Sequence, residues 1–256
     1  MQLKDRVIII SGAGSGIGAA LARRFAEEGP GGLILADLNG ESADLVAGEI
    51  GAIPFQADVS LYDDNVRLID FAEERFGPVD LFCANAGIGF AGDEQTPADE
   101  WNRMWDVNLM SHVHAAKRLV PGWLARGEGY FLSTASAAGL LTNLKAAQYA
   151  VTKHGAVAFS EWLAVTYGSQ GLKVSCLCPM GVKTPFLDSA EEFGPLLEPY
   201  AIEPEQVADV VVAGLEEESF LILPHPEVKK FIQNKANDYD RWITGMQNLQ
   251  SAVFPT

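Results

Sequence analysis

The residues with the clearest chemical potential are Tyr149 and Lys153, which stand four positions apart in a stretch with a helical pattern. Side chains at this spacing project from one face of a helix, so we expect the phenol and the ammonium to share a site. A free phenol titrates at about pH 10 and is a poor base at neutral pH, but a nearby ammonium lowers its pKa. Ser136 follows a strand that ends near Thr134, where its hydroxyl can hydrogen-bond an oxygen atom as charge develops on it. These residues predict proton exchange with a substrate oxygen, with Tyr149 as the acid/base.

A second candidate site is the glycine-rich run Ser11-Gly12-Ala13-Gly14-Ser15-Gly16-Ile17-Gly18, which lies between an aliphatic segment and a helical pattern. Glycines let the backbone turn tightly and approach a pyrophosphate, and the free N–H groups of a helix N-terminus attract that anion. No lysine follows the run, which excludes a P-loop nucleoside triphosphatase. A tight turn without a ligand and a methyltransferase that uses S-adenosylmethionine both fit this part of the chain, so the second half must decide.

Asp37 ends the next aliphatic run and lies about 20 residues beyond the loop, where the dinucleotide fingerprint places an acid on the adenosine ribose. A carboxylate accepts hydrogen bonds from ribose hydroxyls and repels a 2′-phosphate, and neither Ser15 nor Leu38 supplies a cation for that phosphate. Asp37 therefore favours NAD over NADP. The alternative is that Asp37 only caps the turn at Asn39 and Gly40.

With Asn108 upstream, the set of motifs closely resembles the short-chain dehydrogenase/reductase family. The resemblance runs from about Leu3 to Leu223. Each piece is weak alone, and their order and spacing carry the resemblance. The pieces are Ser11-Gly12-x-x-x-Gly16-Ile17-Gly18, Asp58-Val59, Asn85-Ala86-Gly87, Asn108, Ser136, Tyr149-x-x-x-Lys153, and Pro179 to Thr184.

This resemblance implies a role for each matching residue. Tyr149 is then the acid/base, Ser136 polarises the substrate oxygen, Lys153 lowers the pKa of the phenol and holds the nicotinamide ribose, and Asn108 holds a water on the proton path. Two departures from the family pattern are Ala84, in place of an asparagine, and Pro179-Met180-Gly181, where the family usually has Pro-Gly. The residues implied to bind NAD are Gly12, Ser15, Gly16, Ile17, Gly18, Asp37, Leu38, Asp58, Val59, Asn85, Ala86, Gly87, Tyr149, Lys153, Pro179, Val182 and Thr184.

The elements that must position these residues alternate short aliphatic strands with longer helices. This alternation predicts an α/β fold of the doubly wound, three-layer Rossmann type with a seven-stranded parallel sheet. We expect strands at Val7–Ser11, Leu33–Asp37, Ile53–Gln56, Leu81–Asn85, Gly129–Thr134, Leu172–Cys178 and Phe220–Leu223. We expect helices near Gly16–Glu28, Ser42–Ile50, Tyr62–Phe76, Pro97–Arg126, Ala147–Gly168 and Pro204–Leu215.

Residues 1–256 are expected to form a single dinucleotide-binding and catalytic domain, because no linker or repeat divides them. Within it, residues of about 185–205 follow a strand as a candidate substrate lid. Residues of about 228–256 form a C-terminal extension, which we expect to pack on its own domain, with a neighbouring subunit as the alternative.

Composition narrows the partners. A formal net charge of −16 makes nucleic acid or an anionic membrane an unfavourable partner. No membrane span or secretory signal is evident, so we expect a cytoplasmic protein. We interpret the three cysteines as buried thiols, with Cys176 and Cys178 on opposite faces of a strand. His112, His114, His154 and His225 lack the spacing of metal ligands, which predicts no metal site and leaves them as surface or packing residues.

We therefore expect an NAD-dependent enzyme that moves a hydride between nicotinamide and a secondary alcohol or ketone. The substrate should have an apolar body, since the expected pocket lining is Ile88, Phe90, Leu140, Leu141, Met180, Phe186 and Leu187. The family resemblance implies a homotetramer, or a homodimer, through the two long helices. A methyltransferase and a catalytically idle family member remain the alternatives, and turnover of any alcohol removes the second.

Overall fold

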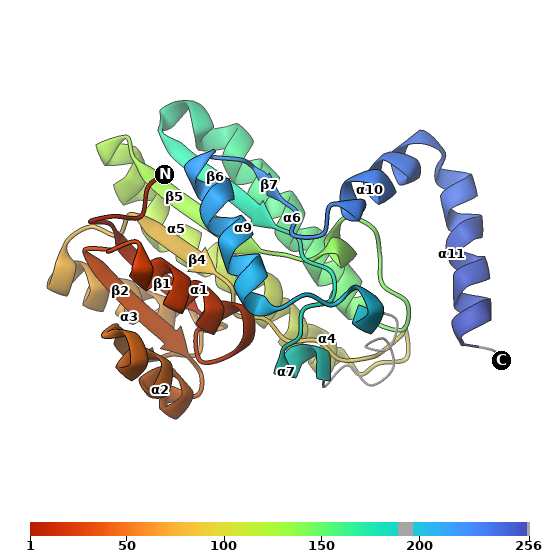
Figure 1. Cartoon of the computed structure of the whole chain (residues 1–256), viewed down its shortest axis with the longest axis horizontal. Helices are drawn as coiled ribbons and strands as arrows, with labels where there is room; N and C mark the ends of the chain where they lie inside the picture. The colour runs from red at the N-terminus through yellow and green to blue at the C-terminus, as the bar shows by residue number, and fades with distance from the viewer. Residues whose placement is uncertain (189–196, 255–256) are drawn as a thin grey trace.

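A single seven-stranded parallel sheet organises the chain (Figure 1). The computed structural model describes residues 1–188 and 197–254. The strand order is β3-β2-β1-β4-β5-β6-β7, which confirms the predicted doubly wound α/β fold. The strands are β1 Val7–Ser11, β2 Gly32–Asp37, β3 Ile53–Gln56, β4 Leu81–Ala84, β5 Gly129–Thr134, β6 Leu172–Leu177 and β7 Leu221–Ile222.

Helices cover both faces of the sheet and bury its alternating side chains. Ile8 and Ile10 of β1 pack in one cluster with α1, α2 and α9, whereas Ile9 between them packs in a second cluster with α3, α5 and α6. Because both faces are covered, the central strands read as continuous aliphatic runs. The helices are α1 Gly16–Glu27, α2 Gly40–Ile50, α3 Tyr62–Phe76, α4 Ala98–Trp105, α5 Ser111–Arg126, α6 Ala147–Tyr167, α7 Pro185–Asp188, α9 Pro204–Glu216, α10 Glu227–Asn237 and α11 Tyr239–Val253.

The order of the strands reverses between β1 and β4, which are neighbours in the sheet. In an open α/β sheet, ligands bind beyond the carboxyl ends of the strands at such a switch point. The glycine-rich run follows β1, Asp37 ends β2, Asn85 follows β4, and Ser136 follows β5. The topology therefore gathers the residues of both candidate sites along one edge of the sheet.

The expected continuous helix Pro97–Arg126 is wrong in detail. It divides into α4 and α5, joined by a π-helical turn over Asp106–Met110. This wider turn inserts a residue into the helical repeat, which a hydrophobic pattern with a 3.6-residue period does not reveal. Asn108, one of the expected catalytic residues, lies within the turn.

The expectation for the strand cysteines is wrong as well. The Sγ atoms of Cys176 and Cys178 lie 3.7 Å apart. Side chains alternate between the two faces of a strand, so residues two positions apart lie on the same face. Both thiols, and that of Cys83, are free and buried as expected.

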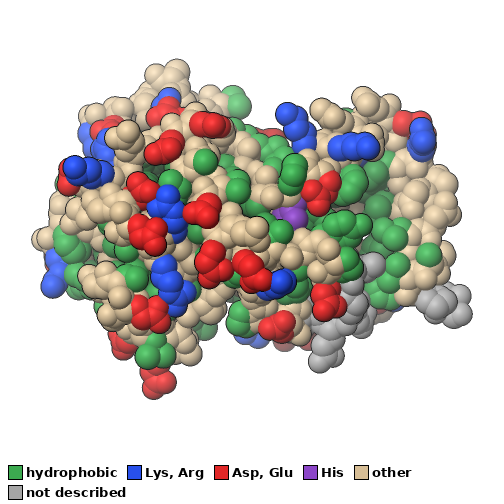
Figure 2. All heavy atoms as spheres, in the orientation of Figure 1, with side chains coloured by type: hydrophobic (Ala, Val, Ile, Leu, Met, Phe, Trp, Pro, Cys, Tyr) green, Lys and Arg blue, Asp and Glu red, His purple; other side chains and the backbone are tan. Residues whose placement is uncertain are grey.

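The C-terminal extension packs on the domain only in part. α10 buries Val228 and Lys235, and the Lys235 ammonium donates hydrogen bonds to the carbonyls of Leu140 and Leu141. α11 has no buried residue and projects away from the sheet at the right of Figure 1. Hydrophobic side chains gather on the main body next to this projecting arm (Figure 2). Within the described ranges, no helix has the length and hydropathy needed to cross a membrane.

Candidate active site

A cavity of about 830 Å³ runs along the carboxyl edge of the sheet. It brings together the glycine-rich loop and the tyrosine–lysine pair, which are more than 130 residues apart in sequence. Every expected NAD-binding residue lines it. These are Gly12, Ser15, Gly16, Ile17, Gly18, Asp37, Leu38, Asp58, Val59, Asn85, Ala86, Gly87, Tyr149, Lys153, Pro179, Val182 and Thr184.

The turn after β1 requires glycine at two positions. Gly12 has φ +65°, and a Cβ added there would lie 2.7 Å from Cα of Ala86. A Cβ on Gly18 would lie 2.0 Å from the carbonyl oxygen of Gly12. The loop therefore folds tightly against the end of β4 and the start of α1, and the first turn of α1 carries no acidic side chain. This cradle of backbone N–H groups suits a pyrophosphate.

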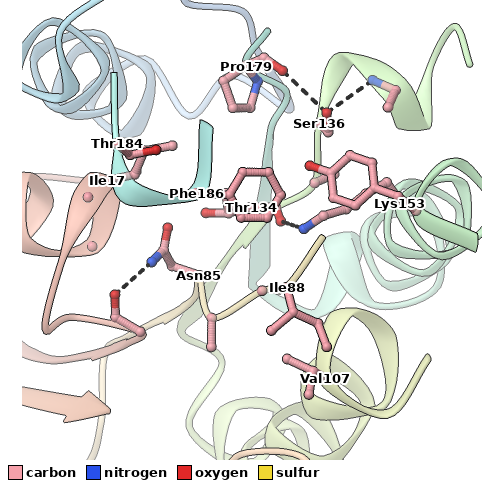
Figure 3. Close-up of a pocket in the computed structure, with 18 of the residues that line it drawn as sticks. Ile17, Asn85, Ile88, Val107, Thr134, Ser136, Lys153, Pro179, Thr184 and Phe186 are labelled. Atoms are coloured by element: carbon pink, nitrogen blue, oxygen red, sulfur yellow. Dashed lines mark hydrogen bonds between the residues drawn. The ribbon is translucent and has the colours of Figure 1, made fainter. Parts of the chain in front are cut away.

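Side-chain hydrogen bonds connect the ends of β1 and β4 beneath the cavity. The Ser11 hydroxyl donates to the carbonyl of Cys83 at 3.2 Å and accepts from the backbone N–H of Asn85 at 3.0 Å. The amide of Asn85 donates to the carbonyls of Ser11 and Gly12, at 3.1 and 3.2 Å (Figure 3). These hydrogen bonds fix the ends of β1 and β4 relative to each other at the switch point. They do so although Ala84 stands where the family pattern has an asparagine.

Asp37 stabilises the turn after β2 and also contacts the glycine-rich loop, while its binding of the adenosine ribose stays a prediction. Its Oδ1 accepts from the N–H of Asn39 at 2.9 Å, which stabilises the turn into α2. Its Oδ2 accepts from the N–H of Gly14 at 2.9 Å, which ties the carboxylate to the glycine-rich loop. Each carboxylate oxygen has a second acceptor site, and Asp37 lines the cavity, so hydrogen bonds to ribose hydroxyls stay available.

Ser136 and Tyr149 meet at the other end of the cavity, where Figure 3 shows Ser136 close to Pro179. The Ser136 hydroxyl accepts from the N–H of Ala138 at 3.1 Å and lies 3.5 Å from the carbonyl of Pro179. It also hydrogen-bonds the Tyr149 phenol, while burial, the larger effect, raises the pKa of that phenol to about 12. The ring of Phe186 packs 5.7 Å from the Tyr149 ring.

Lys153 points its ammonium at the backbone between these groups. Nζ donates to the carbonyl of Thr134 at 2.9 Å and lies 5.8 Å from the centre of the Tyr149 ring (Figure 3). Burial lowers the pKa of Lys153 to about 8. Burial is the largest effect on the Tyr149 phenol and raises its pKa, so the expectation that Lys153 and a positively charged nicotinamide together lower that pKa stays a prediction.

Asn108 lies behind the cavity and is fully buried. Its Oδ1 accepts from the N–H of Ile88 at 2.8 Å, and its Nδ2 donates to the carbonyl of Ile88 and to the Thr152 hydroxyl. Gly87 lies between Asn108 and the Lys153 ammonium. A Cβ added to Gly87 would lie 3.3 Å from Lys153 Nζ and 3.4 Å from Asn108 Oδ1. The backbone before α4 thus passes directly between these two side chains.

The apolar end of the cavity contains most of the residues expected to contact substrate. Ile88, Leu141, Met180, Phe186 and Leu187 line it. Phe90 and Leu140 are not part of this lining: Phe90 packs in a cluster with Tyr149 and Phe186 at the edge of the cavity, and Leu140 packs in another cluster with Val157 and Cys178. Residues 189–196 of the expected lid lie outside the described residues.

Sequence reasoning missed a polar face of α4 and of the turn that follows it. Asp99, Asn102, Arg103 and Asp106 line the cavity. Their spacing of three, four and seven positions places them on one side of a helix, and this is the signal that would have identified them. Thr142 and Asn143, also in the lining, carry no comparable pattern. In the described part of the chain, no group of three His, Cys, Asp or Glu side chains is arranged to hold a metal ion.

Known proteins match this chain over most of its length. The family model for short chain dehydrogenases matches residues 6–193. The chain is 30% identical to the 1-deoxy-11-beta-hydroxypentalenate dehydrogenase of Streptomyces exfoliatus, over 95% of this chain and 92% of that protein. It is 31% identical to the cyclohexanol dehydrogenase of Acinetobacter sp. (strain SE19), over 86% and 92% of the two chains. A short chain dehydrogenase/reductase from Burkholderia phymatum, crystallised in complex with NAD, matches the fold with a TM-score of 0.86 and 28% identity, covering 94% of this chain and 96% of that one.

Proposed function

Because this chain belongs to the short-chain dehydrogenase family, we propose that it is an NAD-dependent enzyme that interconverts a secondary alcohol and a ketone. The observation that carries the proposal is one continuous cavity with Ser136, Tyr149 and Lys153 at one end and the glycine-rich loop with Asp37 at the other. A cofactor held by the loop at one end would supply its hydride chemistry at the end that contains the phenol. The methyltransferase alternative accounts for the loop but leaves this second group of residues without a role.

The described residues fit NAD. The loop after β1, where a Cβ on Gly12 or Gly18 would collide with backbone, would hold the pyrophosphate. Asp37 would accept hydrogen bonds from the adenosine ribose, and Val182 and Thr184 would contact the nicotinamide end. When bound, the cofactor supplies the carbon that accepts or donates the hydride.

The side chains of this protein would manage the proton and hold the substrate oxygen. During oxidation, the Tyr149 oxygen takes the proton from the substrate hydroxyl, and during reduction it returns one. Ser136 donates a hydrogen bond to the same substrate oxygen, which favours the form that carries more negative charge. Lys153, together with the positive charge that the oxidised cofactor would supply, would lower the pKa of the phenol, and Asn108 holds the backbone of Ile88 behind the site.

The apolar end of the cavity favours a substrate with a carbocyclic or otherwise apolar body. Leu141, Met180, Phe186 and Leu187 carry no charge there. The charged lining residues Arg103 and Asp106 lie on α4 and on the π-helical turn that follows it. Two relatives are named as dehydrogenases of cyclohexanol and of a hydroxypentalenate. We therefore place cyclic secondary alcohols first among the candidate substrates.

The test is an NAD-reduction screen over cyclic and open-chain secondary alcohols, followed by the absorbance of the reduced nicotinamide. We expect turnover with a cyclic alcohol and its loss in Tyr149→Phe, with NADH affinity nearly unchanged because the phenol acts on the substrate. Tyr167→Phe, which removes a phenol oxygen far from the cavity, is the matched control and keeps full activity. A Tyr149→Phe variant with a substantial fraction of wild-type kcat overturns the acid/base assignment, and failure of every substrate favours an idle family member.

The proposal includes a homotetramer, with a homodimer as the alternative. α6 exposes Val151, Trp162 and Val165, which have 47%, 53% and 86% of their surface accessible in the single chain. Apolar side chains along one long helix are suited to pairing with the same helix of a second copy. Light scattering that gives the mass of a monomer at working concentration would reject this assembly.

A further inference from the structure

His225, expected to be a surface or packing residue, lies between two backbone segments beside the cavity. It follows β7 and precedes α10, and only 2% of its surface is exposed. Its Nδ1 accepts from the backbone N–H of Met180 at 3.1 Å. Its Nε2 lies 3.1 Å from the carbonyl oxygens of both Gly181 and Tyr200. Both ring nitrogens are therefore engaged with main-chain groups.

These partners define one form of the ring. A backbone N–H only donates, so Nδ1 carries no proton. A carbonyl only accepts, so Nε2 carries the proton. The hydrogen-bond network thus assigns His225 as the neutral Nε2–H tautomer, because a cationic ring would set a second N–H against the N–H of Met180.

The first of the two segments forms the wall of the cavity. Met180 lies between Pro179 and Val182, which line the proposed nicotinamide end. The carbonyl of Pro179 accepts from the N–H of Ala137 at 2.8 Å and lies near the Ser136 hydroxyl. A displacement of Met180 would therefore move groups that face both the cofactor and the substrate-polarising serine.

The second segment is held against the first by backbone hydrogen bonds. Ile202 donates to the carbonyl of Gly181 at 3.2 Å and accepts from the N–H of Lys183 at 3.0 Å. A Cβ on Gly181 would lie 2.6 Å from the carbonyl oxygen of Leu197, so glycine is needed one position later than the family pattern places it. Met180, which stands at this departure from the pattern, donates its N–H to Nδ1 of His225, and this hydrogen bond accommodates the departure.

We infer that His225 is a positioning residue for the nicotinamide-facing segment Pro179–Thr184, acting through Met180 N–H and the carbonyls of Gly181 and Tyr200. The inference rests on the proposed function, because it assumes that this segment contacts NAD(H). His225 itself does not line the cavity, so it would act on cofactor and substrate only through the backbone. Its effect is to fix the backbone of the residues that line the cavity.

Three substitutions separate the contributions of the two ring nitrogens. His225→Asn keeps an acceptor near the position of Nδ1 and loses the Nε2 donor. His225→Gln keeps a donor near the position of Nε2 and loses the Nδ1 acceptor. His225→Leu loses both. His154→Leu is the matched control, because within residues 1–188 and 197–254 the His154 ring hydrogen-bonds only the carbonyl of Ala150, one helical turn away.

The measurement is NADH binding by fluorescence, with unfolding midpoints for each variant and kcat and KM where a substrate is known. We expect the NADH dissociation constant to rise at least tenfold in His225→Leu and less in His225→Gln. We expect His225→Asn, which keeps the Met180 bond, to stay within about threefold of wild type. His154→Leu binds NADH as wild type does. A purely structural role would lower the unfolding midpoints and leave NADH affinity of the folded protein unchanged.

Nitrogen-15 NMR of the histidine rings tests the tautomer without cofactor. The signal lost in His225→Asn should belong to a neutral ring with the proton on Nε2 at neutral pH. A cationic ring or the other tautomer in the NMR spectrum overturns the inference. Wild-type NADH affinity in His225→Gln also overturns it, and this variant serves as the test if His225→Leu does not fold. A wild-type protein that does not bind NADH overturns the proposed function and this inference together, whereas equal binding by wild type and variants overturns the inference alone.

Discussion

Replacing Lys153 with methionine should stabilise the protein at neutral pH while abolishing activity. The ammonium is buried, with 3% of the residue exposed, and burial lowers its pKa from 10.5 to about 8. At 1.36 kcal/mol per pKa unit, this difference means that the buried charge lowers the free energy of unfolding by about 3 kcal/mol. Methionine removes the charge but also the hydrogen bond to Thr134, which stabilises by about 1 kcal/mol. The net expectation is a gain of about 2 kcal/mol at pH 7.

The sign of the pH dependence follows from the two pKa values. Below about pH 8, Lys153 is charged in the folded and unfolded states, so the full cost is present. Between about 8 and 10.5 the unfolded chain holds a proton that the folded protein has released, and the wild type gains stability as pH rises. At pH 9.5 the free energy of unfolding of the wild type should be about 2 kcal/mol higher than at pH 8. Lys153→Met should then be no more stable than the wild type.

Urea titrations of both proteins at pH 7 and pH 9.5, without cofactor, measure this difference. Lys229→Met is the control, because Lys229 is exposed on α10 and should leave stability nearly unchanged at both pH values. If Lys153→Met destabilises the protein equally at both pH values, burial of the ammonium does not destabilise the folded protein and the reasoning is wrong.

Three further changes address the cofactor site and the core. In the wild type we expect kcat/KM for NAD to exceed that for NADP by a factor of about 100 or more. Asp37→Ser combined with Leu38→Arg should lower this ratio to about one or below, because the variant lacks the carboxylate that repels the 2′-phosphate and gains a guanidinium that binds it. Equal wild-type values for the two cofactors would contradict this. Gly18→Ala should abolish NADH binding in a fluorescence titration, because its Cβ would lie 2.0 Å from the Gly12 carbonyl, and an unimpaired variant would refute that geometry. The third change is His112→Asn. Burial lowers the pKa of His112 from 6.5 to about 3, so between pH 6.5 and 5 only the unfolded chain takes up a proton at this residue. Over that range the free energy of unfolding of the wild type should fall by about 2 kcal/mol relative to the variant. Parallel urea-stability curves for these two proteins would show that the imidazole does not contribute.

The parts of the fold and the site that could be predicted from the sequence depend on neighbouring residues. The run from Ser11 to Gly18 predicts its turn because glycine is needed where no Cβ fits, and the structure places Gly12 at φ +65°. Asp37 ends β2 because it follows an aliphatic run that is buried on both faces. The four-residue spacing of Tyr149 and Lys153 places both side chains in the cavity from one helix.

The parts that could not be predicted depend on distant segments. His225 is 45 positions from Met180, and no local pattern indicates that its ring lies against that backbone. Phe90 and Leu140 resemble pocket residues in the sequence, but the paths of their loops direct them into hydrophobic clusters. The π-helical turn at Asn108 depends on the backbone of Ile88, which the asparagine side chain binds on both its N–H and its carbonyl.

The acid–base properties of the site belong to this second group, because they come from burial rather than from residue type. Spacing alone indicates that an ammonium lies near a phenol and so predicts a lowered pKa for Tyr149. In the folded protein, loss of solvation acts on both groups and favours their neutral forms, which raises the pKa of Tyr149 to about 12 and lowers that of Lys153 to about 8. Charges in such a low-dielectric site interact more strongly than in water, so a positive charge brought into the cavity shifts the phenol further toward its ionised form than the same charge would in solvent.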